Sequence, residues 1–123
     1  MVIGINGKNN PMETSAHVAM CGNFGYEMDL AKLSDSEMEQ VKDQIKLYKN
    51  IRKTVQFGDM YRFGNPFSDT RSGVCYKDED KMVLFTFQIR PQMNGEEWRI
   101  KLSCAEDGEK YEYNGKIYSG ESL

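Results

Sequence analysis

Histidine, tryptophan and cysteine are scarce in this chain of 123 residues. It contains one histidine, one tryptophan and three cysteines. A zinc site needs three or four protein ligands, so the single histidine, His17, leaves little from which to build one. The odd number and wide spacing of Cys21, Cys75 and Cys104 argue against a disulfide framework and indicate a reducing compartment.

Long hydrophobic runs and an excess of positive charge are also missing. No apolar stretch approaches the ~18 residues that a membrane span requires, and residues 1–8 lack the regions of a signal peptide. Asp and Glu total 19 against 16 Lys and Arg, a net charge of −3, so a basic surface for nucleic acid is not expected. We expect a soluble, cytoplasmic chain with neither a nucleic-acid nor a membrane partner.

Motifs for phosphate binding and nucleophilic catalysis are absent as well. Neither G-x-x-x-x-G-K-[ST] nor G-x-G-x-x-G occurs, and no serine stands in a G-x-S-x-G turn. His17 and Cys21 are four residues apart and can share a helix face, but no third ligand lies near them in the sequence. We interpret them as a partly buried helix pair, and we expect no catalytic residue, no cofactor and no metal in this chain.

The first half of the chain has helical periodicity after an irregular start. Residues 4–11 are polar and rich in Gly and Asn, so we expect a loop there. Pro11 suits the first turn of a short helix over about 13–22.

One long amphipathic helix is predicted over about 35–57. Ser34 and Glu37 form a capping box at its start, and Gly58 provides a residue that can end it. The expected core stripe has steps of three and four residues and consists of Met38, Val41, Ile45, Tyr48, Arg52 and Val55, widened by Leu47 and Ile51.

The second half has the period of strands. Residues 81–89 are apolar on both faces, as in a central strand covered on both sides. We also expect a short strand at 74–76, a half-buried strand at 98–104, and a hairpin over 111–118 whose Asn114-Gly115 suits a type I′ turn.

These elements predict an α+β fold class, with N-terminal helices followed by an antiparallel β-meander or partial β-sandwich. The turn-forming residues 64–69 mark the seam between a helical part, 1–66, and a β part, 67–123.

Four groups of side chains stand out, and each has a simple structural explanation. Carboxylates at 35–43 suit a helix surface, those at 78–80 and 106–107 suit turns, and the eight methionines suit core filling. The basic residues Lys46, Lys49, Arg52 and Lys53 suit a solvated helix face. The aromatic residues Trp98, Tyr111, Tyr113 and Tyr118 could stack on a sugar, but core packing is the default for aromatic residues in strands.

Two segments are distinctive: AHVAMCGNFGYEMDL at 16–30 and QFGDMYR at 56–62. With the capped helix between them and Asn65-Pro66-Phe67 after them, they closely resemble the C-terminal part of bacterial α-galactosidases of the melibiase/raffinose type, glycoside hydrolase family 36. The resemblance covers about 11–120 and is most specific over 16–67.

The resemblance implies that 13–63 correspond to the last helices of a (β/α)₈ barrel and 71–123 to the start of a β-sandwich. In that family two aspartates at barrel strand ends act as nucleophile and acid/base, and the matching part of this chain carries neither. The family has arginine where Ser15 stands, a histidine-containing strand segment where residues 1–10 stand, and further strands beyond Leu123.

The function expected from this resemblance is that of a non-catalytic C-terminal fragment with a structural and association role. An α-galactoside such as melibiose or raffinose would be a ligand only of the intact parent enzyme. An open sheet edge and an uncovered helix face would favour a homo-oligomer. The alternative is a stand-alone carbohydrate- or protein-binding β module, suggested by the tyrosine-rich hairpin and Trp98.

Overall fold

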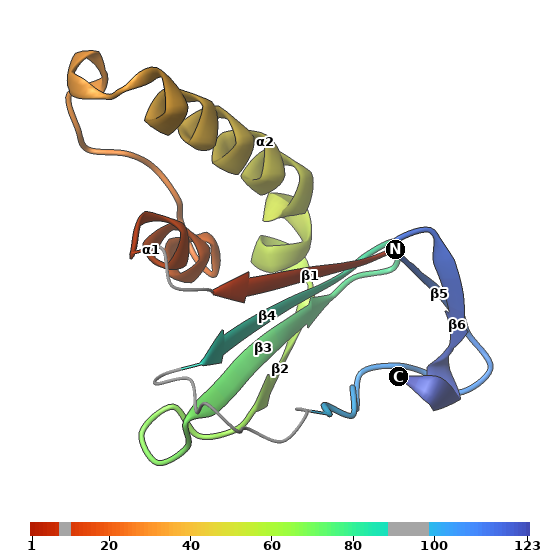
Figure 1. Cartoon of the computed structure of the whole chain (residues 1–123). Coiled ribbons are helices and arrows are strands. Elements are labelled where there is room, and N and C mark those ends of the chain that lie inside the picture. The colour runs from red at the N-terminus through yellow and green to blue at the C-terminus, as the bar shows by residue number, and fades with distance from the viewer. Residues whose placement is uncertain (8–10, 89–98) are drawn as a thin grey trace.

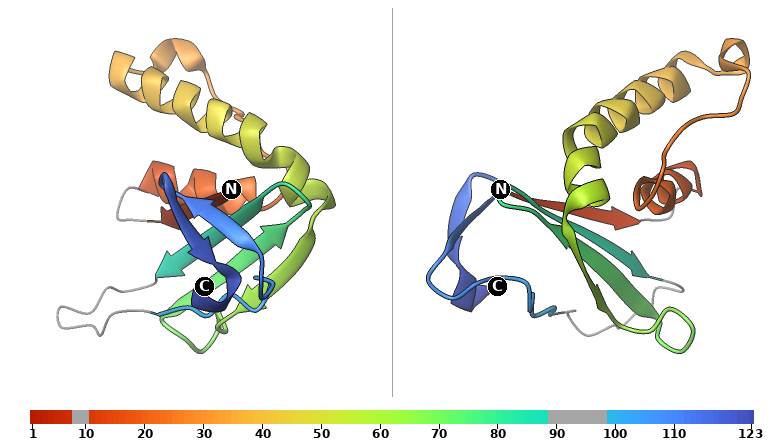
Figure 2. Two further views of the ribbon diagram at one scale, coloured as in Figure 1. Left: turned by 90° about the vertical axis from the view of Figure 1, so that its right-hand side faces the viewer. Right: turned by 180° about the vertical axis from the view of Figure 1, so that it is seen from behind.

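A four-stranded sheet lies between two helices on one side and a C-terminal hairpin on the other (Figures 1 and 2). The computed structural model describes residues 1–7, 11–88 and 99–123. Its elements are β1 (Val2–Gly7), α1 (Pro11–Met20), a 3₁₀ turn (Leu30–Lys32), α2 (Asp35–Phe57), β2 (Asp59–Phe63), β3 (Arg71–Lys77), β4 (Met82–Gln88), β5 (Lys110–Tyr113), β6 (Lys116–Ser119) and a last 3₁₀ turn (Gly120–Ser122). The α+β fold class is confirmed.

Helix α2 begins and ends where its sequence predicts. The Glu37 backbone N–H donates to Ser34 Oγ at 3.3 Å, and the Ser34 N–H donates to Glu37 Oε2 at 2.8 Å, which completes the capping box. Gly58 ends the helix with a negative φ of −76° rather than in the left-handed region. A side chain there would press on the Lys77 carbonyl of β3, so close approach to the sheet requires the glycine.

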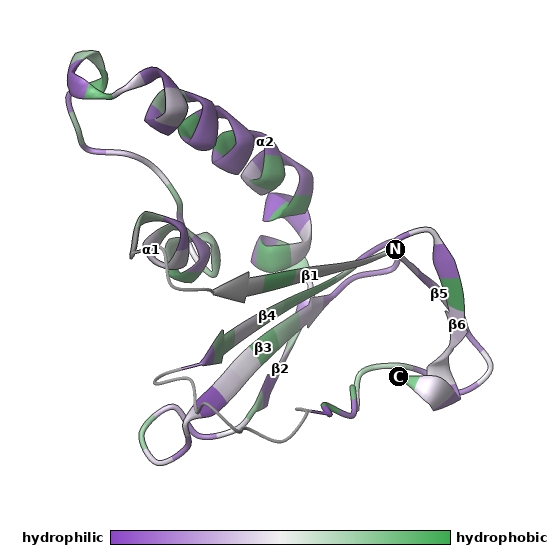
Figure 3. Cartoon of the chain, viewed as in Figure 1, coloured by the Kyte–Doolittle hydropathy of each residue, from purple (hydrophilic) through white to green (hydrophobic). Residues whose placement is uncertain are grey.

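The buried stripe of α2 differs in part from the predicted one. Its buried residues are Val41, Gln44, Ile51, Thr54 and Val55. Ile45 and Arg52, which were expected in the stripe, are exposed. In Figure 3, hydrophobic residues recur at intervals among the hydrophilic residues of α2, as in an amphipathic helix.

The N-terminal segment forms a strand, so the loop expected at 4–11 is wrong for 4–7, and residues 8–10 lie outside the described residues. Strand β1 pairs in parallel with β4, and Ile5 lies opposite Phe85. Pro11 does open α1, because its missing N–H has no helical partner to lose at that position. Strand β2 was also not predicted. The sheet order is β1-β4-β3-β2, so β1 and β2 are its edge strands.

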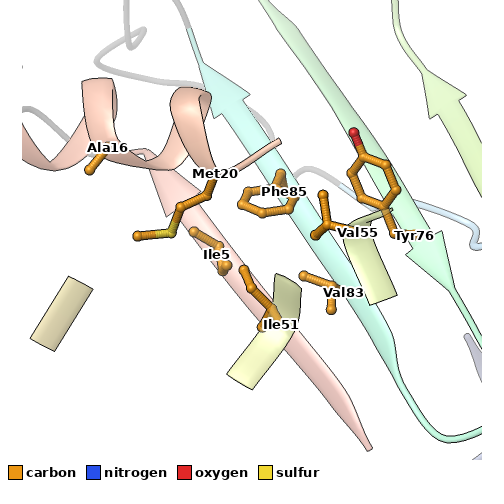
Figure 4. Close-up of a cluster of buried hydrophobic side chains, with 8 residues drawn as sticks. All are labelled: Ile5, Ala16, Met20, Ile51, Val55, Tyr76, Val83 and Phe85. Atoms are coloured by element: carbon orange, nitrogen blue, oxygen red, sulfur yellow. The ribbon is translucent and has the colours of Figure 1, made fainter. Parts of the chain in front are cut away.

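Strand β4 is buried on both faces, as its continuous apolar sequence predicts. Val83 and Phe85 face the helices, where they join Ile5, Ala16, Met20, Ile51, Val55 and Tyr76 in a helix-side core (Figure 4). Met82 points the other way and joins Cys75, Leu102, Cys104 and Tyr111 in a C-terminal core. Successive strand residues point to opposite faces, so β3 and β4 supply both cores.

The C-terminal layer is less regular than expected. The β5–β6 hairpin forms as predicted, with Asn114 at φ 50° and Gly115 at φ 74° in its turn. The strand expected at 98–104 is wrong for 99–104, where the chain forms coil and a turn, and Trp98 lies outside the described residues. Leu102 and Cys104 are nevertheless buried, whereas Lys101 and Ser103 are exposed. Over residues 1–7, 11–88 and 99–123, no helix is long and apolar enough to cross a membrane.

Candidate functional site

The carboxylates of α2 lie on its exposed surface, where they support the helix. Glu37 accepts hydrogen bonds from the Ser34 hydroxyl and backbone, and these lower its pKa. Glu39 pairs with Lys42 at 2.6 Å between Oε1 and Nζ. The acidic residues of this helix therefore act in capping and in local ion pairing.

Asp78 organises the turn between β3 and β4. Its carboxylate accepts hydrogen bonds from Thr54 Oγ1 at 2.7 Å, from the Asp80 N–H at 2.8 Å and from the Lys81 N–H at 2.7 Å. Burial alone would raise its pKa, but these three hydrogen bonds outweigh burial and lower it. Asp78 is therefore held as an anion that ties the end of α2 to the turn.

A surface hollow of about 610 Å³ gathers six carboxylates at this junction. They are Asp59, Asp78, Glu79, Asp80, Glu106 and Glu109. Lys77 Nζ lies 2.5 Å from Glu106 Oε1 and 4.0 Å from Glu109 Oε2. The hydrogen bond to Glu106 raises the pKa of Lys77, because it favours the charged ammonium.

Asp78, one of the carboxylates of this hollow, does not suit the role of a general acid. A general acid for glycoside cleavage requires a carboxyl group whose pKa is raised. The hydrogen bonds that Asp78 accepts lower its pKa instead. The arrangement suits an electrostatic junction between α2, β3 and the turn at 106–109.

His17 lies in α1, and Cys21 lies in the turn directly after that helix. His17 is buried, and Cys21 Sγ donates to the His17 carbonyl at 3.6 Å. Burial raises the pKa of the Cys21 thiol to about 11. The pair is partly buried as expected, but Cys21 lies one residue beyond the end of the helix. Among the described residues, no three His, Cys, Asp or Glu side chains are grouped to hold a metal ion.

A polar hollow of about 430 Å³ between α1 and α2 was not predicted. Its lining consists of Glu13, His17, Ser36, Glu39, Gln40, Asp43, Gln44 and Leu47. Gln44 is buried, and its Oε1 accepts a hydrogen bond from the Tyr26 hydroxyl. A search of the sequence for apolar residues at helical spacing does not find such a position, because glutamine normally faces solvent.

Two tyrosines of the hairpin, Tyr111 and Tyr113, pack into the C-terminal core. Tyr111 is buried in the C-terminal core, and its hydroxyl donates to Glu109 and accepts from the Glu106 N–H. Tyr113 packs against the same core. Core packing, the default interpretation, is confirmed for these two residues. The basic residues Lys46, Lys49, Arg52 and Lys53 are all exposed on α2, as a solvated face would have them.

Two cysteines far apart in the sequence meet in the C-terminal core. The sulfur atoms of Cys75 and Cys104 lie 3.2 Å apart, and Met82 Sδ lies 3.9 Å from Cys104 Sγ. All three cysteines are free thiols. Nothing in the sequence pairs residues 75 and 104, because their meeting depends on how the segment at 99–105 folds over the sheet.

Comparison with known proteins gives a consistent result in sequence and in fold. The sequence profile of the melibiase family matches residues 4–58. The chain is 32% identical over 120 residues to α-galactosidase AgaA of Geobacillus stearothermophilus. That alignment covers 95% of this chain and 16% of that enzyme. It is 37% identical over 121 residues to the probable α-galactosidase G of Emericella nidulans, covering 95% of this chain and 17% of the relative.

The fold also matches a solved structure. The crystal structure of AgaA, a family-36 α-galactosidase, superposes with a TM-score of 0.86 and 29% identity, covering 98% of this chain and 18% of that one. The chain is therefore a relative of the glycoside hydrolases. More narrowly, it is a fragment related to the melibiase-type α-galactosidases of family 36 and matches one segment of them.

Proposed function

We propose that this chain serves as a non-catalytic, structural part of the C-terminal region of an α-galactosidase. The observation that carries the proposal is the match of 98% of this chain to a segment making up 18% of such an enzyme. The carboxylates described above support it, because those with known partners cap a helix, close a turn or pair with lysine. The substrate of the whole enzyme would be an α-galactoside such as melibiose or raffinose.

We also propose that the two parts of this chain have different places in the enzyme. Residues 1–66 would belong to the end of a catalytic barrel, and 67–123 would begin a β domain that covers it. The order of β1 followed by α1 supports this, because a strand followed by a helix is the repeating unit of such barrels. Within this chain, the parallel pairing of β1 with β4 links the first part to the second.

An association role is supported by exposed apolar side chains. Phe57 is 82% exposed, Phe67 is 98% exposed and Ile117 is 71% exposed. The outer edges of β1 and β2 also carry backbone groups that can pair with another strand. We expect these features to contact other parts of the enzyme or a second copy of the chain.

Hydrolysis of a nitrophenyl α-galactoside by the purified chain tests the proposal directly. We expect no release of nitrophenol above a protein-free blank, with a full-length family-36 α-galactosidase as the positive control. Reproducible turnover by the chain alone would overturn the non-catalytic assignment. Light scattering at rising concentration tests the association role, for which we expect dimers or larger species. A monodisperse monomer at high concentration would count against it.

A further inference from the structure

The buried sulfur cluster between the sheet and the C-terminal segment has no part in the proposed structural role. Cys75 lies on β3, opposite Leu84 of β4, and is fully buried. Cys104 lies in the turn that follows Leu102, where the Ala105 N–H donates to the Leu102 carbonyl at 2.9 Å. The two thiols come from segments 29 positions apart and touch at 3.2 Å.

We propose that Cys75 and Cys104 are a thiol oxidation site, which forms a reversible intrachain disulfide on exposure to hydrogen peroxide. A disulfide bond has a sulfur–sulfur distance of about 2.05 Å, so the sulfur atoms need to approach by roughly 1 Å. Cys75 is held in a central strand, whereas Cys104 sits in an irregular turn. The turn can therefore supply the movement without disturbing the sheet.

The electrostatics favour Cys104 as the residue that reacts first. A hydrogen bond from the Cys75 thiol stabilises the Cys104 thiolate and lowers its pKa, against the opposing effect of burial. Lys77 acts in the same direction as that hydrogen bond. The bond between the two thiols and burial together raise the pKa of Cys75. Cys104 also retains 5% exposure, whereas Cys75 has none.

The chemistry balances with one peroxide for each disulfide. The Cys104 thiolate attacks one peroxide oxygen, the O–O bond breaks, and a sulfenic acid and hydroxide form. The Cys75 sulfur then attacks the sulfenic sulfur, the S–O bond breaks, and the oxygen leaves as water once Cys75 has given up its proton. Two thiols lose two electrons in total, and one peroxide becomes two waters.

Cys21 provides an internal contrast. It packs against the helix-side core, on the opposite face of the sheet from Cys75 and Cys104. Its thiol donates to the His17 carbonyl, and burial raises its pKa to about 11. A high pKa and the absence of a neighbouring thiol among the described residues both make Cys21 the slower cysteine.

The consequence of the disulfide is a covalent tie between the sheet and the C-terminal layer. In the reduced chain, that layer is held by contacts such as the Leu102 N–H to Leu123 carbonyl bond at 2.8 Å and the Lys77–Glu106 pair. A cross-link across a segment of this length restricts the unfolded chain and raises stability. Oxidation would therefore strengthen the C-terminal side of the sheet.

The test uses the chain with Cys21→Ser, so that two cysteines remain. After treatment with hydrogen peroxide, we expect alkylation under denaturing conditions to find no free thiol. Peptide mapping should recover a cross-link between Cys75 and Cys104 that dithiothreitol reverses. The oxidised chain should melt roughly 5–15 °C higher than the reduced chain.

The matched control is the chain with Cys21→Ser and Cys104→Ser, in which the remaining thiol should survive the same treatment and the melting temperature should not rise. The wild-type chain should give the same cross-link with Cys21 left free, which keeps the test valid if a variant folds poorly. Two intact thiols after treatment, a sulfinic acid at Cys104 without a cross-link, or disulfide-linked dimers would each overturn the proposal.

Discussion

The two faces of the central sheet are covered in different ways. On one face, α1 and α2 bury a core of Ile5, Met20, Ile51, Val83 and Phe85 with other apolar residues (Figure 4). On the other face, a coil segment and a two-stranded hairpin bury a smaller core that contains Cys75, Met82 and Cys104. The first core is made by regular elements, and the second by an irregular chain fitted closely onto the sheet.

This difference predicts two kinds of sensitivity to mutation. The helix-side core depends on the volume of large side chains, so it should respond most to their truncation. The C-terminal side depends on backbone segments in close contact, since Gly120 packs on the Glu106 carbonyl and donates to the Glu109 carbonyl at 2.9 Å. It should respond most to added atoms.

Truncation of Phe85 should have the largest effect. Phe85 is fully buried and packs edge-on against Tyr76, with ring centroids 6.1 Å apart. We expect Phe85→Ala to lower the free energy of unfolding by about 3–5 kcal/mol, measured by urea denaturation. Phe57→Ala is the matched control, because Phe57 is 82% exposed and should cost less than about 0.5 kcal/mol. Similar losses of stability in the two variants would show that the helix-side core does not depend on the volume of its side chains.

Adding a methyl group at Gly120 should have the next largest effect. A Cβ atom there would overlap the Glu106 carbonyl oxygen, which is backbone and cannot rotate away. We expect Gly120→Ala to lower the free energy of unfolding by about 1–3 kcal/mol. Gly25→Ala, in the loop beside the helices, is the control, since no atom lies within 4 Å of its added Cβ. If Gly120→Ala were as stable as this control, the close backbone fit of the C-terminal side would be refuted.

The sequence predicts the helix side well because its signals are local. The capping box at Ser34 and Glu37 lies within four consecutive residues, and it places the start of α2 correctly. The edge strand β1 was missed for the opposite reason. Its residues include Gly4 and Gly7, and its pairing partner β4 begins about 80 positions later, with Val2 opposite Met82.

The C-terminal side shows what an alternating pattern does and does not predict. Alternation over 99–104 predicts which side chains are buried, and Leu102 and Cys104 are buried. It does not predict a strand, because a strand also needs a neighbouring backbone to accept its hydrogen bonds. The Cys75–Cys104 contact and the buried Gln44 were missed on similar grounds, since each depends on elements distant in the sequence.

The smallest predicted effect concerns the place where the two sides meet, at the turn organised by Asp78. Its pKa is lower in the folded chain than the unfolded value of about 3.9, so its contribution to stability is present above about pH 4. That contribution is lost as the pH falls through the folded pKa, because protonation removes the anion that Thr54 and the turn N–H groups stabilise. We expect Asp78→Asn to lower the free energy of unfolding at pH 7 by about 1 kcal/mol, and the difference from wild type to narrow below about pH 4. Urea denaturation between pH 7 and pH 2 measures this, with Asp107→Asn as the exposed control. A difference that stayed constant over this range would mean that the hydrogen bonds to Asp78 do not favour its charged form.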